Sequence, residues 1–463
     1  MEYAETRTES QKKKAQIAVG TRVRLSWLVR IALLLLPVWW FLGLEQFIWP
    51  LLFFPLAVML VYSRAKEGRG IYLPAAGRWG LLYLAVQLLS ALFIVETSWY
   101  LVFVRNLALW VGGASLYLLI VNLFPFGSEG FDRLLRTVAL VTLFSCVAAF
   151  LPVLNIVDVQ FVSPLAKVLP PVVTNSEFAQ AILDKSWSAL EATTIFGIRF
   201  GRPRSFFTYP NPFAGYLVLT LPLLVYGATR QTNRLRRWLW IGLAALAGST
   251  LIITTSRAGI VSCLVAVFFV RQRLAARWRF LIYAALVCAL LVGVGVVLEY
   301  SLTQDSLFQW GESLVTARGK SHLTRLTVYE ATFRSWLERP LFGWGTQRTP
   351  TAGGLTPNYP PLGSHSTYIA VLYRHGLVGF AIFALMIAAV IQQLYRRGLD
   401  RPAKEFVLFA RWAVIGSLLH IILLEVDLDA TLLTTMWLVW GLVAVATRRE
   451  RSIDPSEAKT VEA

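Results

Sequence analysis

Apolar residues along this chain gather into long continuous runs, most of which have the length of a membrane-spanning helix. Each run predicts a helix, because backbone groups in lipid must find hydrogen-bond partners within their own segment. None shows the two-residue alternation of barrel strands. We therefore predict an all-α polytopic membrane protein with about 12 transmembrane helices. The runs lie at 26–44, 46–63, 79–95, 100–124, 134–154, 210–228, 237–255, 257–271, 278–299, 366–394, 405–425 and 429–447.

Lysine and arginine are distributed unequally between the loops on the two sides of these helices. Alternate loops are basic, whereas three short loops between them contain no Lys or Arg and a fourth contains only Arg257. These four poorly basic loops lie near 44–46, 95–99, 254–257 and 425–429. Basic loops remain on the cytoplasmic side of a membrane. We therefore predict that both termini are cytoplasmic and that the two long loops, 155–209 and 300–365, are extracytoplasmic.

A single membrane domain accounts for nearly the whole chain. We predict a cytoplasmic tail over 1–25, a transmembrane domain over 26–447 and a cytoplasmic tail over 448–463. The first apolar run is interpreted as a retained helix, because 41–45 is a poor signal-peptide cleavage site. Most of the net charge of +18 comes from Lys and Arg that flank apolar runs. This placement predicts contact with membrane lipids and not with nucleic acid.

Two arginines precede the apolar run that begins near residue 210, on the predicted outer side. Arg202 and Arg204 lie shortly before a Pro-Asn-Pro turn centred on Asn211. A guanidinium group is a planar, permanently charged fork that binds phosphate oxygens. The alternative is a basic loop that only contacts lipid headgroups, and the pattern alone does not separate these two interpretations.

Arg257 is the lone basic residue in an otherwise uncharged outer turn, Thr254-Thr255-Ser256-Arg257-Ala258-Gly259. An arginine within a membrane helix costs about 2.5–3.5 kcal/mol at the centre and less near the ends. Such a position indicates a functional charge. The alternative is an interfacial arginine whose guanidinium reaches the headgroups.

The second long loop contains a predicted helix over 321–337, whose apolar residues recur at helical spacing. This helix either lies on the membrane surface or covers a cavity. Arg325 and Tyr329 are four residues apart and share one of its faces. Glu330 and Arg334 have the same spacing and are interpreted as a solvated ion pair.

His365 lies where the second long loop meets the next apolar run, on the predicted outer side. A neutral imidazole there can accept a proton from an attacking hydroxyl, although a lone histidine is more often a capping or packing residue. His420 is interpreted as a packing residue near the middle of its helix. Asp427-Leu428-Asp429 has the form of a metal-binding Asp-x-Asp motif, but an ordinary acidic loop is favoured, and no metal site is predicted.

These motifs, in this order and on one side of the membrane, resemble the superfamily of O-antigen ligases and polymerases. The resemblance covers roughly 200–380. It departs from the family at Arg374, where the family often has an acidic residue, so any role for an acid at that position is in doubt. The residues that carry it are Arg204-Ser205-Phe206-Phe207-Thr208-Tyr209-Pro210-Asn211, Ser256-Arg257-Ala258-Gly259, Arg325, Pro340-Leu341-Phe342-Gly343-Trp344-Gly345, His365-Ser366-Thr367-Tyr368 and Gly376-Leu377-Val378-Gly379.

The resemblance implies a metal-independent, inverting membrane glycosyltransferase of the GT-C type that needs no cofactor. Such enzymes transfer a glycan from undecaprenyl diphosphate to an acceptor hydroxyl at the outer face of the bacterial inner membrane. The resemblance implies that His365 is the base and that Arg204, Arg257 and Arg325 bind the diphosphate. Lesser candidates for the site are Asn211, Tyr329 and Arg202.

Several alternatives remain open. We favour a ligase that uses lipid A-core as acceptor, in lipopolysaccharide biosynthesis. A polymerase that extends another lipid-linked glycan and a branch that glycosylates protein are the alternatives within the superfamily. A secondary transporter is the main alternative of another class, and Arg105, near the outer end of its helix, is the residue it would use. A non-catalytic scaffold is a further alternative.

Overall fold

The computed structural model describes residues 20–170, 183–188, 190–195, 198–270 and 324–448, together with residues 174 and 180. The predicted run 278–299 lies outside these residues, and helices cover the other eleven predicted runs. The helices are Gly20–Leu34, α2 Leu36–Leu42, α3 Ile48–Lys66, α4 Ala75–Ser90, α5 Tyr100–Leu123, α6 Glu129–Val153, α9 Pro210–Arg230, α10 Arg234–Ile253, α11 Arg257–Val270, α14 Thr367–Leu394, α15 Arg401–His420 and α16 Ala430–Ala446. Shorter 3-10 helices are η1 Ala91–Phe93, η2 Thr97–Trp99, η3 Pro164–Lys167, η5 Pro350–Gly353 and η6 Val426–Leu428.

Six of these helices are long and apolar enough to cross a membrane, counting only the described residues: α3, α4 extended by η1, α5, α6, α9 and α14. A seventh candidate is the pair formed by Gly20–Leu34 and α2, which is bent by 57° at its break. The shorter helices α11 and α16 are also apolar. The prediction of a mostly helical polytopic membrane protein is confirmed, while the number of twelve spans stays a prediction.

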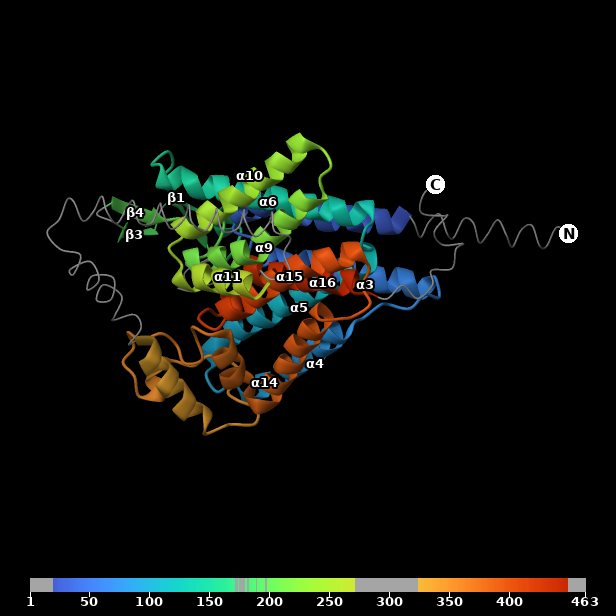
Figure 1. Ribbon diagram of the computed structural model, residues 1–463. Coiled ribbons are helices and arrows are strands. Elements are labelled where there is room, and N and C mark those ends of the chain that lie inside the picture. The colour runs from blue at the N-terminus through green and yellow to red at the C-terminus, as the bar shows by residue number, and fades with distance from the viewer. Residues whose placement is uncertain are drawn as a thin grey trace.

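Helix α16 forms the centre of the bundle, packed between α5 and α9 (Figure 1). Every one of its residues is buried, as expected for a helix that is apolar all round. The indole of Trp437 lies against α5, where a Cβ on Gly113 would come within 2.1 Å of its ring. The absence of a side chain at Gly113 therefore lets α5 and α16 approach closely.

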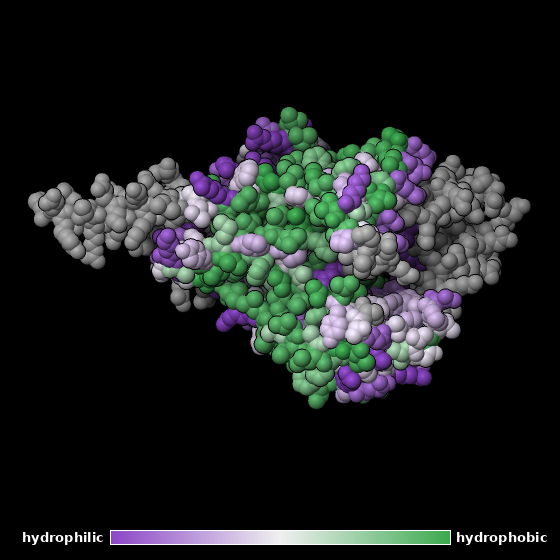
Figure 2. Space-filling model, turned by 180° about the vertical axis from the view of Figure 1, so that it is seen from behind, coloured by the Kyte–Doolittle hydropathy of each residue, from purple (hydrophilic) through white to green (hydrophobic). Residues whose placement is uncertain are grey.

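The outer surface of the bundle carries an apolar band. Figure 2 shows hydrophobic residues over the middle of the molecule and hydrophilic residues gathered towards its two ends. Leu51, Tyr62, Leu88 and Leu239 are among the large apolar side chains that the described helices expose. An exposed apolar surface of this extent fits contact with lipid hydrocarbon.

The basic loops meet at one end of the bundle. Arg22 forms an ion pair of 3.1 Å with Glu67, and the guanidinium of Arg448 lies 4.4 Å from the ring centre of Tyr72. The first and last described helices therefore have their outermost residues at the same end, opposite the β-strands (Figure 1). This arrangement supports the prediction that both termini share one side of the membrane.

The first long loop contains two small antiparallel sheets, which the all-α prediction missed. Strand β1 (Val159–Val162) pairs with β2 (Asp184–Trp187), and β3 (Leu190–Ile195) pairs with β4 (Ile198–Arg202). The first pair joins strands that are far apart in sequence, so no tight-turn signal announces it. Phe161 and Trp187 contact Trp40 of α2 edge-on, which attaches the loop to the helix bundle.

Candidate active site

Arg202 connects the loop before α9 to the turn before α11. Its Nε donates to the carbonyl oxygen of Thr254 at 3.0 Å, and its Nη2 donates to Oδ1 of Asn211 at 3.0 Å. Two of the predicted site residues, Arg202 and Asn211, are therefore in direct contact. Their contact ties the end of β4 to the start of α9.

Arg204 lies across that loop and holds its backbone. Its Nε and Nη2 donate to the carbonyl oxygen of Ser186 at 3.2 and 2.7 Å, and its Nη1 donates to that of Thr208 at 3.4 Å. A guanidinium group has five N–H groups. Three donors of Arg204 thus shape the loop, which leaves the others for a ligand.

Arg257 is exposed at the first residue of α11. The hydroxyl of Ser256 caps this helix by accepting from the backbone N–H of Gly259 at 3.3 Å. A Cβ on Gly259 would lie 2.8 Å from that of Ala214 on α9, so glycine is required for α9 and α11 to pack this closely. The motif Ser-Arg-Ala-Gly therefore presents a cation at a helix N-terminus, where the helix dipole also attracts anions.

His365 occupies an unusual backbone position immediately before α14. Its φ is +68°, in the left-handed region that non-glycine residues seldom adopt. Its carbonyl oxygen accepts from the hydroxyl of Tyr329 at 3.3 Å. Burial, and after it the positive charge of Arg325, lower the pKa of His365 below 6.5. The imidazole is thus neutral at pH 7, the form that can accept a proton.

The predicted helix over 321–337 is confirmed where the structure describes it, at 324–336. It brings Tyr329 into contact with His365 and brings the charge of Arg325 close enough to lower the pKa of His365, as their shared face predicts. Glu330 and Arg334 form an exposed ion pair of 2.5 Å, with 63% and 77% of their side chains exposed, so the interpretation as a solvated pair is confirmed.

The end of α15 connects these two groups of candidates. Nε2 of His420 lies 3.0 Å from the carbonyl oxygen of Asn211, and the carbonyl oxygen of Ile421 accepts from the backbone N–H of Thr367 at 3.1 Å. The prediction that His420 lies near the middle of its helix is wrong, because α15 ends at this residue. His420 is buried and donates a hydrogen bond, which makes it more than a packing residue.

A loop fills a break in α14. Gly376 has φ +62° and ψ −165°, which interrupts the helix. The backbone N–H groups of residues 344 and 345 donate to the carbonyls of residues 373 and 374, at 3.0 and 2.7 Å. In return, the N–H groups of 377 and 378 donate to the carbonyls of 340 and 341, at 2.8 and 3.1 Å. The motif Pro-Leu-Phe-Gly-Trp-Gly thus supplies backbone partners at the break.

We expect Gly376→Ala to destabilise the folded protein. The backbone conformation at Gly376 is one that only glycine adopts readily, and strain of this kind costs about 1–3 kcal/mol. A Cβ there would also lie 2.3 Å from the carbonyl group of Leu341. Thermal unfolding in detergent measures the effect. The matched control is Gly248→Ala in α10, where an added Cβ meets nothing within 4 Å. Equal stability of the two variants would contradict the packing argument.

A buried cluster of charges, which the sequence pattern did not reveal, lies between α14 and η6. Arg374 contacts the carboxylates of Glu425 and Asp427, and all three side chains are buried. Arg105 donates to the carbonyl oxygens of Asp427 at 2.9 Å and Leu428 at 3.0 Å. Arg105 therefore has a structural role, because it holds the backbone of η6. No transport role is needed to explain its position.

The acidic turn at 425–429 is occupied by protein partners. Asp429 caps α16 by accepting from the N–H groups of Thr431 and Leu432, both at 3.0 Å, and it also accepts from the hydroxyl of Thr208 at 3.1 Å. No group of three His, Cys, Asp or Glu residues suited to a metal ion occurs within the described part of the chain. These contacts favour the interpretation of this turn as a structural acidic loop.

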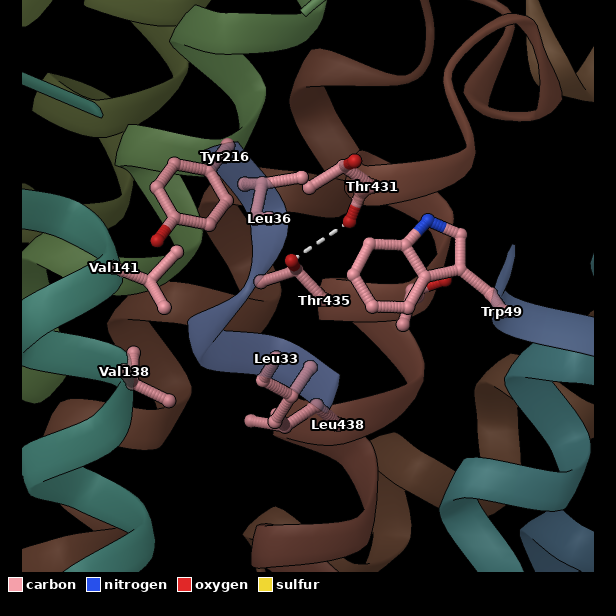
Figure 3. A pocket seen from close by; sticks show the side chains of 10 residues that line it. Leu33, Leu36, Trp49, Val138, Val141, Tyr216, Thr431, Thr435 and Leu438 are labelled. Carbon is pink, nitrogen blue, oxygen red and sulfur yellow. Dashed lines mark hydrogen bonds between the residues drawn. The ribbon is translucent and has the colours of Figure 1, made fainter. Parts of the chain in front are cut away.

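A cavity of about 20 Å³ lies inside the bundle, lined mostly by apolar side chains (Figure 3). Within it, the hydroxyl of Thr435 donates to the carbonyl oxygen of Thr431 at 2.7 Å. A space of this size holds about one water molecule. It is too small for a transported solute, which makes it a poor substrate site for a transporter.

Comparison with known proteins connects this geometry to a family. Residues 242–384 match the family described as O-antigen ligase. The chain contains an O-antigen ligase domain. Four of the seven candidate residues lie in this O-antigen ligase domain: Arg257, Arg325, Tyr329 and His365. The comparison with curated proteins finds no match.

The match over 242–384 and the apolar helices together support a membrane glycosyltransferase of the O-antigen ligase and polymerase type. The resemblance drawn from the sequence motifs is thereby confirmed. The domain includes the turn before α11, the helix at 324–336 and the break in α14. It therefore covers the elements that carry Arg257, Arg325 and His365.

Proposed function

We propose that this protein transfers a glycan from undecaprenyl diphosphate to an acceptor hydroxyl at the periplasmic face of the inner membrane. The observation that carries the proposal is the position of His365, which contacts Tyr329 and lies in the segment that matches the O-antigen ligase family; burial and the charge of Arg325 lower its pKa. In the reaction, the acceptor oxygen attacks C1 of the glycan and the bond from C1 to the diphosphate oxygen breaks. The hydroxyl proton passes to His365, and the configuration at C1 inverts.

The leaving diphosphate gains negative charge as this bond breaks, so cations placed around it stabilise the transition state. Arg257, Arg325 and Arg204 are proposed to supply them. Exposure at the start of a capped helix supports Arg257 in this role. The uncommitted donors of Arg204 support a secondary contribution, since its other donors hold the loop.

We propose ligation to lipid A-core as the specific reaction, with metal-independent catalysis. Elongation of a second lipid-linked glycan by a polymerase is the alternative within the same superfamily. The two activities differ only in the acceptor, so one assay with both acceptors distinguishes them.

A reconstituted transfer assay tests the proposal. Purified protein in liposomes is given an undecaprenyl diphosphate-linked glycan with either lipid A-core or a second lipid-linked glycan, in the presence of EDTA. Product on lipid A-core supports the ligase, and elongated lipid-linked chains identify a polymerase. Donor binding without product from either acceptor would refute the proposed transfer.

The charge of Arg325 is expected to shift the pH profile of transfer. Burial and Arg325 hold the pKa of His365 below 6.5, so the base is neutral and active down to mildly acidic pH. In Arg325→Gln the electrostatic contribution is lost and the pKa of His365 rises. Activity will then decline at a higher pH as the solution is acidified.

The pH dependence of kcat/KM measures this shift. The control is Arg334→Gln, which removes an exposed guanidinium from the same helix and is expected to leave the profile unchanged. An acid limb at the same pH in wild type and Arg325→Gln would contradict the assignment of His365 as the base.

A further inference from the structure

The segment between α15 and α16 is held to α14 by buried ion pairs. Arg374 of α14 donates to Asp427 through Nη1 at 3.0 Å, and its Nη2 contacts a carboxylate oxygen of Glu425. The side chains of Arg374 and Glu425 are 4% and 1% exposed. Gln347 adds hydrogen bonds of 2.8 and 3.1 Å to the two carboxylate oxygens of Glu425. A buried ion pair with several partners is a rigid support, because water is excluded from it and cannot replace a partner that moves away.

The residues of this ion-pair network and of the turn 424–427 also hold the backbone on both sides of His365. On the N-terminal side, Nη2 of Arg374 donates to the carbonyl oxygen of Gly363 at 3.1 Å. On the C-terminal side, the hydroxyl of Thr367 donates to the carbonyl oxygen of Leu424 at 2.8 Å and accepts from the backbone N–H of Val426 at 2.9 Å. His365 therefore lies between two residues that are held to the turn 424–427: Thr367 directly, and Gly363 through Arg374. We call these two attachments the anchors of His365.

His365 has a strained backbone conformation that needs such support. A non-glycine residue in the left-handed region is strained, and it persists only where its surroundings impose that conformation. The φ of +68° at His365 is such a case. A third contact, from the N–H of Gly363 to the hydroxyl of Thr332 at 3.1 Å, attaches the same stretch to the helix that carries Arg325. These contacts together hold the backbone on both sides of His365 against the helix that carries Arg325.

We propose that Arg374 and Thr367 are positioning residues, which act through the turn 424–427 to hold His365 in its reactive orientation. The inference rests on the proposed function, in which His365 receives the proton of the acceptor hydroxyl. A displacement of about 1 Å in a reacting group can cost about 100-fold in rate. Loss of either anchor therefore lowers kcat and leaves the affinity for the donor unchanged.

Two conservative variants test the anchors separately. Arg374→Lys keeps the positive charge beside the two carboxylates but loses the guanidinium fork that reaches Gly363. Thr367→Val keeps the shape of the side chain and removes the hydroxyl, while Thr367→Ser retains the hydroxyl as the matched control. We expect kcat to fall by about 10- to 100-fold in the first two variants. The control is expected to stay near wild type, with the KM for the donor unchanged in all three.

A double-mutant cycle separates positioning from general damage. If Thr367 acts through His365, adding Thr367→Val to His365→Ala causes no further loss of rate. A further loss equal to that of the single variant overturns the inference, and so does unchanged kcat in both Arg374→Lys and Thr367→Val. Wild-type protein that makes no product refutes the proposed function instead. Amide hydrogen exchange of residues 363–367 then still tests whether Thr367 holds this backbone. The inference requires these amides to exchange faster in Thr367→Val than in Thr367→Ser.

Discussion

Replacement of His365 by alanine is expected to reduce transfer by about 100- to 10,000-fold, the usual contribution of a general base. The buried environment and the charge of Arg325 keep this imidazole neutral, and the proposed reaction needs a proton acceptor next to the acceptor hydroxyl. Single-turnover transfer in liposomes, with saturating donor and acceptor, measures the loss in the chemical step itself.

The appropriate control separates the imidazole from the backbone that carries it. Asparagine tolerates the left-handed conformation better than other non-glycine residues, so His365→Asn preserves the turn and removes the base. We expect His365→Asn to be as inactive as His365→Ala while it binds the donor normally. Substantial transfer by His365→Asn would show that this position serves only to shape the turn.

Arg257→Ala is expected to lower kcat by about 100- to 1000-fold, the effect of removing one group that stabilises a developing anion. Arg257→Lys should lie between the alanine variant and wild type, because it restores the charge without the planar fork. The measurement is kcat for transfer together with the dissociation constant of the lipid-linked donor.

The control for Arg257 is Arg234→Ala, which removes an exposed arginine at the opposite end of α10. It is expected to leave transfer unchanged. If Arg257→Ala transfers at the wild-type rate in a folded protein, the arginine serves only as an interfacial charge and the diphosphate is held by other groups.

Much of the fold follows from the sequence because lipid leaves the backbone few choices. Continuous apolar runs predict helices, and the one undescribed run aside, helices lie where these runs are. The same reasoning selects the candidate residues, since it predicts that His365, Arg257 and Arg325 lie in segments that connect the helix ends on one side of the membrane. The family match covers these three residues as well.

The long-range pairings did not follow from the sequence. Arg374 and Glu425 are separated by 51 positions. The sequence around each residue does not show which distant charge it pairs with. Likewise, β1 pairs with β2 although the two strands are far apart in the sequence. A pattern within one segment reports which face is buried, but it does not report which distant segment covers that face.

The break in α14 also constrains how the protein is assembled. Each unpaired backbone group costs several kcal/mol in hydrocarbon, and the groups around Gly376 find their partners in residues 340–345. The backbone hydrogen bonds at the break in α14 therefore cannot all form within α14 itself; they need residues 340–345. Because 340–345 precedes 367–394 in the sequence, these backbone partners have already been synthesised when α14 enters the membrane. The two segments can therefore join during translation, in the direction in which the chain is made.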